Sequence, residues 1–284
     1  MTMISRLTQK IEGLKNTIAL RYFRNNPDSY MKFLYKRQMK RLDQIIQYGD
    51  NPFNEADWSA GHYEEWDDRE LRDLENPKRG WHTLIDGELR WASAQEIRDR
   101  FIDCLCREID AAIADGAEPS VLEVGCGNAT NLVALKERYG DKLRLSGFDV
   151  ANQRVAVGKQ YYGNRLTGVD MRVASVADPN LPELYKNTFG IVFSMHCLEQ
   201  IPNLAAIAVE NMLALSSGRV VMIEPDWEHA YPAQRVYLIV SDHMRTLLKT
   251  CQAKGAKVLK GERFELQSSL KNPSTLIVLN AKKA

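Results

Sequence analysis

Short apolar stretches alternate with amphipathic ones through the second half of the sequence, and this alternation limits the folds open to the chain. Stretches typical of buried strands fill residues 121–125, 143–150, 169–175, 189–196 and 218–225. Helical periodicity is present at 131–139, 153–162, 204–215 and 233–254. Successive parallel strands need crossovers, which are usually helices that cover the sheet. The pattern therefore predicts an α/β, Rossmann-like fold with a mainly parallel sheet.

Two further strands are expected at 262–269 and 274–281, and they complete a seven-stranded sheet. Only the short connection 271–274 joins them, and it has no room for a helix. Strands joined in this way pair antiparallel. We therefore expect an antiparallel pair at one end of the sheet, with the last strand running against the others.

The turn after the first strand reads VLEVGCGNAT and occupies residues 121–130. In open α/β sheets, ligands bind at the carboxyl ends of the strands, where the first turn presents backbone N–H groups. Gly125 and Gly127 allow the backbone to bend and to approach a ligand closely. A dinucleotide fingerprint needs a glycine or alanine three residues after Gly127, but Thr130 stands there. Glu123 lies inside the strand, where a carboxylate is costly to bury unless something pairs with it.

This turn resembles motif I, ExGxGxG, of the class I S-adenosylmethionine-dependent methyltransferases. Glu123, Gly125 and Gly127 match the motif, and Ala129 stands in place of the third glycine. The resemblance continues through the ends of the later strands and covers residues 121 to about 281. It implies S-adenosylmethionine as the cofactor. In this turn it implies the cofactor-binding residues Glu123, Gly125, Cys126, Gly127, Asn128 and Asn131.

The ends of the next two strands supply further cofactor contacts under the same resemblance. Asp149, with Val150 beside it, ends the second strand, and its carboxylate can accept hydrogen bonds from both hydroxyls of a ribose. After the third strand, Ser175 and the Val176 backbone are the favoured adenine contacts. Asp178 is the alternative.

The fourth strand ends in FSMHCLEQIPN, which resembles the family's strand followed by a Leu-Glu-His-Ile-Pro-Asp type turn. Gln200 replaces the usual histidine of that turn. The resemblance places Ser194 and Met195 along the methionine half of the cofactor. His196 is a candidate general base near neutral pH or a residue that shapes the pocket, and Glu199 is a second candidate base.

The resemblance implies transfer of a methyl group to an O or N nucleophile of a small molecule or peptide, in specialised metabolism. Because fold and cofactor site do not fix the reaction, two alternatives stay open. One is transfer or cyclisation of the aminocarboxypropyl half, which releases methylthioadenosine, and the other is a regulatory protein that binds the cofactor without turnover. The candidate acceptor contacts, for which packing or loop roles are the alternative, are Tyr63, Trp91, His196, Trp227, His229 and Tyr231.

Residues 1–92 carry no motif of that family, and we expect them to form a mostly helical extension to a methyltransferase domain at 93–284. Apolar stripes indicate helices at 4–18 and 29–48, which we expect to form a lid over the acceptor pocket or a homodimer contact. The Asp86-Gly87 pair predicts a hairpin at 84–90. A capping box at 93–96 begins a helix that ends near residue 115.

Charge and cysteine content narrow the expected partners. The formal net charge is +1, which gives no reason to expect a nucleic acid. The five cysteines form no CxxC pair, so we expect free thiols, a cytoplasmic location and no metal site. The first 20 residues lack a long apolar stretch, and we therefore expect no membrane partner.

Overall fold

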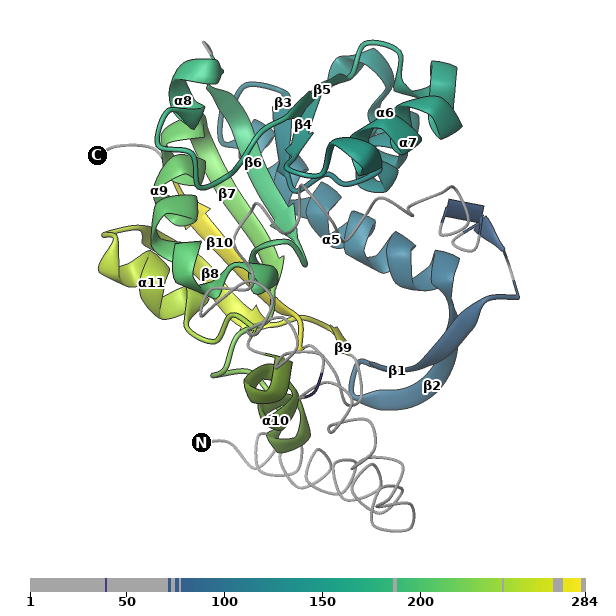
Figure 1. The fold of residues 1–284 in the computed structure, drawn as a ribbon, viewed down its shortest axis with the longest axis vertical. Helices are drawn as coiled ribbons and strands as arrows, with labels where there is room; N and C mark the ends of the chain where they lie inside the picture. Colours follow the sequence, from purple (N-terminus) through teal and green to yellow (C-terminus); the bar gives the residue numbers. More distant parts are fainter. Residues whose placement is uncertain are drawn as a thin grey trace.

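The computed structural model describes residues 39, 71–72, 75–76, 78–185, 188–241, 243–267 and 273–281. Its centre is a sheet of seven strands in the order β5-β4-β3-β6-β7-β10-β8 (Figure 1). Their bounds are β3 (Ser120–Val124), β4 (Arg144–Asp149), β5 (Asp170–Val173), β6 (Phe189–Met195), β7 (Ser216–Glu224), β8 (Lys257–Arg263) and β10 (Thr275–Asn280). The strands from β5 to β7 are parallel, and β10 runs antiparallel to both of its neighbours. The expected Rossmann-like sheet with an antiparallel last strand is confirmed.

The edge strand β8 lies earlier in the chain than expected. It begins at Lys257 and ends at Arg263, whereas the expected strand spans 262–269. Most of its residues are exposed, so it lacks the apolar pattern that marks a buried strand. Leu266 and Gln267, expected in that same strand, instead form β9 (Leu266–Gln267) in a second sheet.

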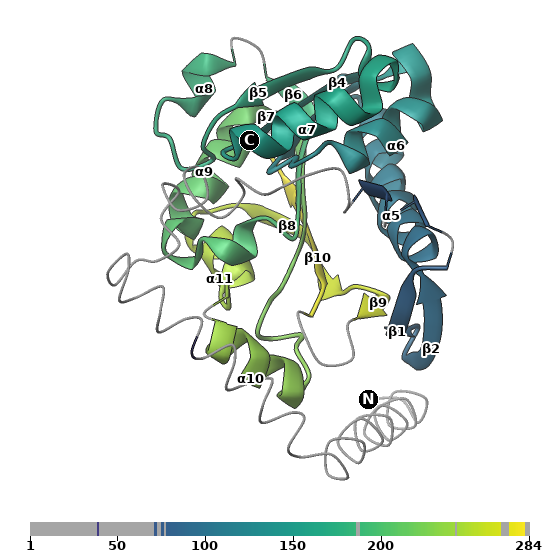
Figure 2. The same cartoon turned by 45° about the vertical axis from the view of Figure 1, so that its right-hand side comes forward.

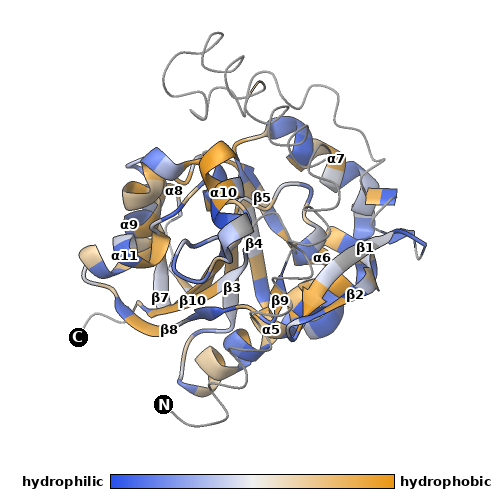
Figure 3. Cartoon of the chain, turned by 90° about the horizontal axis from the view of Figure 1, so that it is seen from below, coloured by the Kyte–Doolittle hydropathy of each residue, from blue (hydrophilic) through white to orange (hydrophobic). Residues whose placement is uncertain are grey.

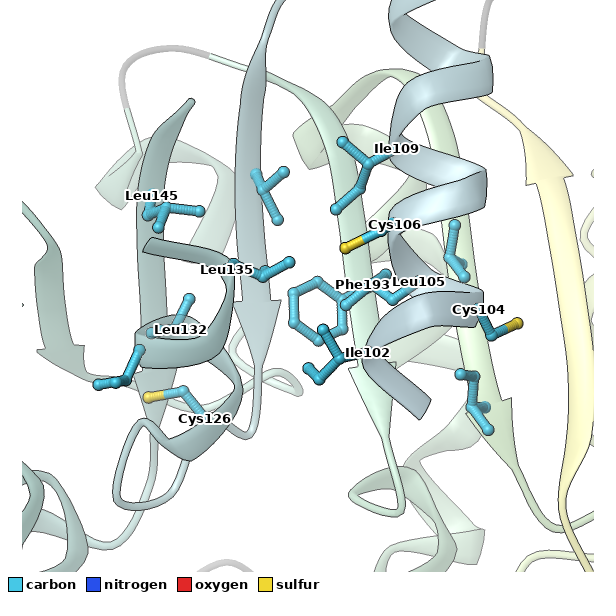
Figure 4. Close-up of a cluster of buried hydrophobic side chains, with 14 of the residues drawn as sticks. Ile102, Cys104, Leu105, Cys106, Ile109, Cys126, Leu132, Leu135, Leu145 and Phe193 are labelled. Atoms are coloured by element: carbon cyan, nitrogen blue, oxygen red, sulfur yellow. The ribbon is translucent and has the colours of Figure 1, made fainter. Parts of the chain in front are cut away.

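The two faces of the large sheet carry separate apolar cores, because alternate residues of a strand point to opposite faces. Val121, Ile191 and Phe193 belong to the core under helix α5 (Ala94–Ala114). Leu122 and Val192 belong to the core on the other face. Figure 4 shows Ile102, Leu105 and Ile109 of α5 turned toward Phe193 of β6. The chain is therefore a three-layer sandwich with helices on both faces.

Helices cover the sheet at nearly the positions that the periodicity predicts. On the face of α5 lie α6 (Thr130–Tyr139) and α7 (Asn152–Tyr162), and the other face is covered by α9 (Ala205–Leu215) and α11 (Leu247–Ala253). A short helix, α8 (Leu181–Leu184), precedes β6. Figure 3 shows hydrophilic and hydrophobic residues side by side on the covering helices, as amphipathic packing requires.

The single helix expected at 233–254 is wrong, because the chain forms α10 (Pro232–Ser241) and α11 with a non-helical segment between them. In that segment the Met244 backbone N–H donates to the carbonyl oxygen of Glu199 at 3.0 Å. The Leu248 N–H reaches the carboxylate of Asp226 at 3.5 Å. Contacts with other parts of the fold thus replace the helical hydrogen bonds that the local pattern favours.

A three-stranded sheet, in the order β2-β1-β9, lies beside the N-terminal end of α5 (Figure 2). The hairpin of β1 (Gly80–Ile85) and β2 (Glu88–Ser93) turns at Asp86 and Gly87, which have φ values of 51° and 78°. These positive values fit the expected two-residue turn. Ser93 caps α5, since its hydroxyl accepts a hydrogen bond from the Glu96 N–H at 3.1 Å.

Several expectations fall on other parts of the chain. Tyr63 and the helix expected at 4–18 lie outside the described residues, as does the helix expected at 29–48 except for Met39, which is helical. The division of the chain at residue 92 stays a prediction. No helix among the described residues is long and apolar enough to cross a membrane. Over the same residues, no group of three or more His, Cys, Asp or Glu side chains is arranged to hold a metal ion.

Candidate functional site

A cavity of about 420 Å³ lies at the carboxyl ends of β3, β4 and β6, with part of its wall formed by α5. This volume lies within the range of sites that hold drug-sized ligands. The lining residues that the sequence motifs predict as ligand contacts are Glu123, Gly125, Cys126, Asn128, Asn131, Asp149, Val150, Val176, Met195 and His196.

The turn after β3 requires glycine at two positions. Gly125 and Gly127 have φ values of 71° and 51°, in the left-handed region. A Cβ at Gly125 would lie 2.0 Å from Cys197 Sγ, and a Cβ at Gly127 would lie 2.7 Å from the guanidinium carbon of Arg154. Ala129, at the position of the third motif glycine, also has a positive φ of 66°. The turn therefore brings the bare backbone of Gly125 to the cavity.

Asp149 is the last residue of β4, and its carboxylate connects the turns after β3 and β4 through hydrogen bonds. One of its carboxylate oxygens accepts a hydrogen bond from the Gly127 N–H at 2.8 Å. The other accepts from the Ala151 N–H, also at 2.8 Å. Because these contacts fix the carboxylate at the cavity wall, its orientation is set before any ligand binds.

Glu123 places a buried carboxyl group in the same cavity. Its Oε1 accepts a hydrogen bond from Asn131 Nδ2 at 2.7 Å. Its Oε2 is buried and has no hydrogen-bond partner among the described residues. Burial raises the pKa of Glu123 to about 8, with a smaller contribution from the neighbouring Asp149 charge and an opposing one from the Asn131 hydrogen bond. This oxygen is available to accept a hydrogen bond from a donor that enters the cavity.

The turn after β6 is held by the buried carboxylate of Glu224. The N–H groups of Cys197 and Leu198 donate to its Oε1 at 3.0 Å and 3.2 Å. The N–H of Glu199 donates to its Oε2 at 3.3 Å. Burial raises the pKa of Glu224 to about 7, although the nearby His196 opposes the rise. This hydrogen bonding stabilises His196 in the left-handed conformation, with φ 49°, which is rare for a residue with a side chain.

Both ring nitrogens of His196 contact polar side chains. Its Nδ1 lies 2.9 Å from the carboxylate of Glu199, and its Nε2 lies 3.0 Å from the hydroxyl of Ser274. The ring of Phe101, on α5, meets the imidazole edge-on with 5.8 Å between ring centroids. Burial by itself lowers the pKa of His196, but the Glu199 carboxylate outweighs it, so that the pKa is raised.

The sequence from 121 to 218 matches the family model described as a methyltransferase domain. Residues 121–218, about a third of the chain, are therefore similar to a methyltransferase domain. The match begins at the first strand of the large sheet and ends in β7, so it contains every strand end that lines the cavity. A search of the curated proteins finds no match.

One solved structure supports the fold, and two others show weaker similarity. The crystal structure of the cyclase SpnF is similar to the chain with a TM-score of 0.52 and 15% identity, over 74% of this chain and 93% of that chain. Magnesium protoporphyrin IX methyltransferase from Synechocystis PCC 6803, with bound S-adenosylmethionine, gives a TM-score of 0.47 at 14% identity, over 66% of this chain and 82% of that chain. Geranyl diphosphate C-methyltransferase from Streptomyces coelicolor A3(2) gives 0.44 at 12% identity, over 58% and 71%.

The other residues predicted from the methyltransferase motifs lie around the cavity but do not line it. The Gly127 N–H donates to the Asp149 carboxylate, and the Glu199 carboxylate contacts His196 Nδ1. The Ser175 hydroxyl accepts a hydrogen bond from the Ala177 N–H at 2.9 Å. Ser194 is buried in β6, and its hydroxyl has no partner within the described part of the chain.

The predicted acceptor contacts other than His196 and Tyr63 lie elsewhere in the described structure. Trp91 is 48% exposed on the hairpin strand β2. Trp227, His229 and Tyr231 fall between β7 and α10, outside the set of residues that line the cavity. There, Arg235 packs over the Trp227 ring at 5.2 Å, and an arginine of β8 packs over Tyr231 at 4.0 Å.

Four residues of α5 and Arg154 of α7 also line the cavity, and no sequence motif predicts them as site residues. The spacing of Ile97 and Phe101 predicts a helix with one apolar face, but it does not say what that face covers. Arg98 lies between them and interrupts the apolar positions, which is the only local signal that the face borders a polar space. The α5 residues are Ala94, Ile97, Arg98 and Phe101.

Proposed function

We propose that the enzyme transfers the methyl group of S-adenosylmethionine to an O or N nucleophile of a small molecule or peptide. The observation that carries this proposal is that one cavity contains both the motif residues Glu123 and Asp149 and an apolar wall from α5. The polar residues at the strand ends can form hydrogen bonds with a nucleoside that carries an amino acid group. Ile97 and Phe101 then border the space left for an acceptor.

The residues around the cavity fit this cofactor. Asp149 offers two oxygens to the ribose hydroxyls, and its hydrogen bonds from the backbone hold it in place. The buried Oε2 of Glu123 can accept from the cofactor's ammonium group. Glycine at positions 125 and 127 lets the turn pass close to Cys197 and Arg154, where a Cβ would clash, and Gly125 lines the cavity. When bound, the cofactor supplies an electrophilic methyl group on a sulfonium, and the protein supplies alignment.

His196 is the residue we assign to accept the acceptor's proton, and Glu199 orients it. A carboxylate at 2.9 Å from Nδ1 keeps the proton on that nitrogen and stabilises the imidazolium that forms. The Nε2 atom is therefore the basic one, and it takes the acceptor's proton only after it leaves its hydrogen bond with Ser274. We expect His196→Asn to lower the turnover rate by roughly 100-fold for an acceptor that must lose a proton.

The proposal is tested by incubating the protein with methyl-labelled S-adenosylmethionine and a panel of hydroxyl and amine acceptors. S-adenosylhomocysteine together with a labelled acceptor supports it. Methylthioadenosine as the product would mean that the aminocarboxypropyl half is used instead. Tight cofactor binding without product from any acceptor would favour a regulatory protein, and either of these results contradicts the proposal.

A further inference from the structure

Arg98 places a positive charge in the wall that α5 contributes to the cavity. It lies four residues after Ala94 and three before Phe101, so these residues share the face of α5 that lines the cavity. Its Nε atom is buried and has no hydrogen-bond partner among the described residues. Its Nη2 donates to Gln95 Oε1 at 2.7 Å. Because a charged donor without an acceptor is costly to bury, the wall holds a donor that a ligand would satisfy.

Glu75, a carboxylate whose charge interacts with Arg98, is already bound by other groups. Its Oε2 accepts a hydrogen bond from the Tyr161 hydroxyl at 2.6 Å, and its Oε1 accepts from Arg165 Nη1 at 3.3 Å. The Tyr161 hydrogen bond lowers the pKa of Glu75 most, and the charge of Arg98 makes a smaller contribution. Both oxygens of Glu75 are thus occupied, which leaves Nε of Arg98 for a different acceptor.

The first residues of α6 lie close to both Arg98 and Glu123. Burial raises the pKa of the Tyr162 hydroxyl, and the Arg98 charge is one of the groups that oppose the rise. The same hydroxyl lies 3.4 Å from Thr130 Oγ1, and Asn131, the next residue, donates to Glu123 at 2.7 Å. The helix begins at Thr130 without a side-chain cap in the described structure. Its first N–H groups therefore add a partial positive charge that favours an anion beside Arg98.

We propose that Arg98 and the start of α6 bind a carboxylate group of a ligand in the cavity. The identity of the ligand rests on the function proposed above. One source is the carboxylate of the cofactor's amino acid group, whose ammonium is assigned to Glu123. The other is a carboxylate on the acceptor, because the apolar residues of the same helix face border the acceptor space. Arg154, which also lines the cavity, lies against Gly127 instead. A guanidinium suits this role because it stays charged and its N–H groups match carboxylate oxygens.

The first experiment is calorimetric titration with S-adenosylhomocysteine and with its decarboxylated analogue, for the wild type, Arg98→Gln and Arg107→Gln. Arg107 is the matched control, since it lies on the same helix, its side chain is 60% exposed and it does not line the cavity. If the site binds the cofactor's carboxylate, we expect Arg98→Gln to bind S-adenosylhomocysteine roughly 10- to 100-fold more weakly. The variant should bind the decarboxylated analogue no more weakly than the wild type, and Arg107→Gln should match the wild type for both ligands.

The second experiment assays each hydroxyl or amine acceptor that carries a carboxylate beside its methyl ester. If the site binds the acceptor's carboxylate, Arg98→Gln keeps its affinity for S-adenosylhomocysteine. We then expect it to raise KM roughly 10- to 100-fold for the carboxylate acceptors and to leave the KM of the esters unchanged. A folded Arg98→Gln variant with neither effect, or one that binds both cofactor analogues equally more weakly, overturns the proposed site.

The same measurements distinguish this site from the proposed function. Methylthioadenosine as the product refutes methyl transfer, whereas a loss of S-adenosylhomocysteine affinity in Arg98→Gln alone leaves the carboxylate site standing. A labelled acceptor formed without any dependence on Arg98 leaves methyl transfer standing and removes the site. A wild type that neither binds S-adenosylhomocysteine nor methylates a carboxylate acceptor overturns both proposals.

Discussion

Glu123→Gln tests whether the cavity keeps a carboxyl group in its neutral form until a ligand arrives. Glu123 is 2% exposed, and its pKa of about 8 compares with 4.5 for the ordinary side chain. An acid whose pKa is higher in the folded state makes the protein less stable as pH rises, because the acid ionises first in the unfolded chain. The free energy of unfolding begins to fall near the unfolded pKa and stops falling above the folded pKa. The total decrease is about 5 kcal/mol, at 1.36 kcal/mol for each pKa unit.

Glutamine cannot ionise, yet it keeps an oxygen that can accept from Asn131. We therefore expect Glu123→Gln to match the wild type near pH 5 and to become several kcal/mol more stable near pH 8. Urea unfolding curves at a series of pH values give both profiles. Glu224, whose pKa is also raised, titrates in both proteins and cancels in the difference. Profiles that stay parallel from pH 5 to about 8.5 would refute this account of Glu123.

Two further substitutions test the glycine turn and the charges beneath α5. Both Gly125 and Gly140 have positive φ, but only at Gly125 would an added Cβ lie within 4 Å of another side chain. In thermal or urea unfolding, Gly125→Ala should therefore destabilise the protein by about 2 kcal/mol or more beyond Gly140→Ala. Equal losses of stability for the two variants would contradict this steric reason. Glu108 is 3% exposed and binds a lysine of β8 and an arginine of β7 at 2.6 Å and 3.1 Å. Glu108→Ala should lower the free energy of unfolding by about 3 kcal/mol. Glu118→Ala, at an exposed ion pair, should lower it by less than about 1 kcal/mol. Similar values for the two variants would contradict the role of burial.

Hydrophobic periodicity alone predicts much of this fold. Helices α6, α7 and α9 begin within a residue of their predicted starts, since each has one buried face that the pattern records. The helix expected at 233–254 is interrupted where Met244 bonds to Glu199. That interaction joins segments about 45 residues apart, and no local pattern can encode it. The exposed edge strand β8 is displaced for a related reason, because exposed strands leave little apolar signal.

Some site residues could likewise be predicted from the local sequence, and others are brought to the site only by tertiary packing. Glu123 could be predicted because a carboxylate inside a buried strand is costly, and Asp149 because the resemblance places an acidic residue at the end of the second strand. Both line the cavity. The partners that control His196 could not all be found in this way. Glu199 is three residues away, but Ser274 reaches the imidazole only through the pairing of β10 in the sheet. Phe101 joins the wall because α5 packs across the sheet, which periodicity does not specify.

We propose that S-adenosylmethionine binds in the cavity at the strand ends, with Asp149 as its ribose contact. Calorimetric titration with S-adenosylhomocysteine, for the wild type and for Asp149→Ala, measures this contact. We expect saturable binding at a single site in the wild type and a loss of affinity of roughly tenfold or more in the variant, which circular dichroism must show to be folded. Equal affinity in a folded Asp149→Ala variant, or no binding by the wild type, would contradict the account.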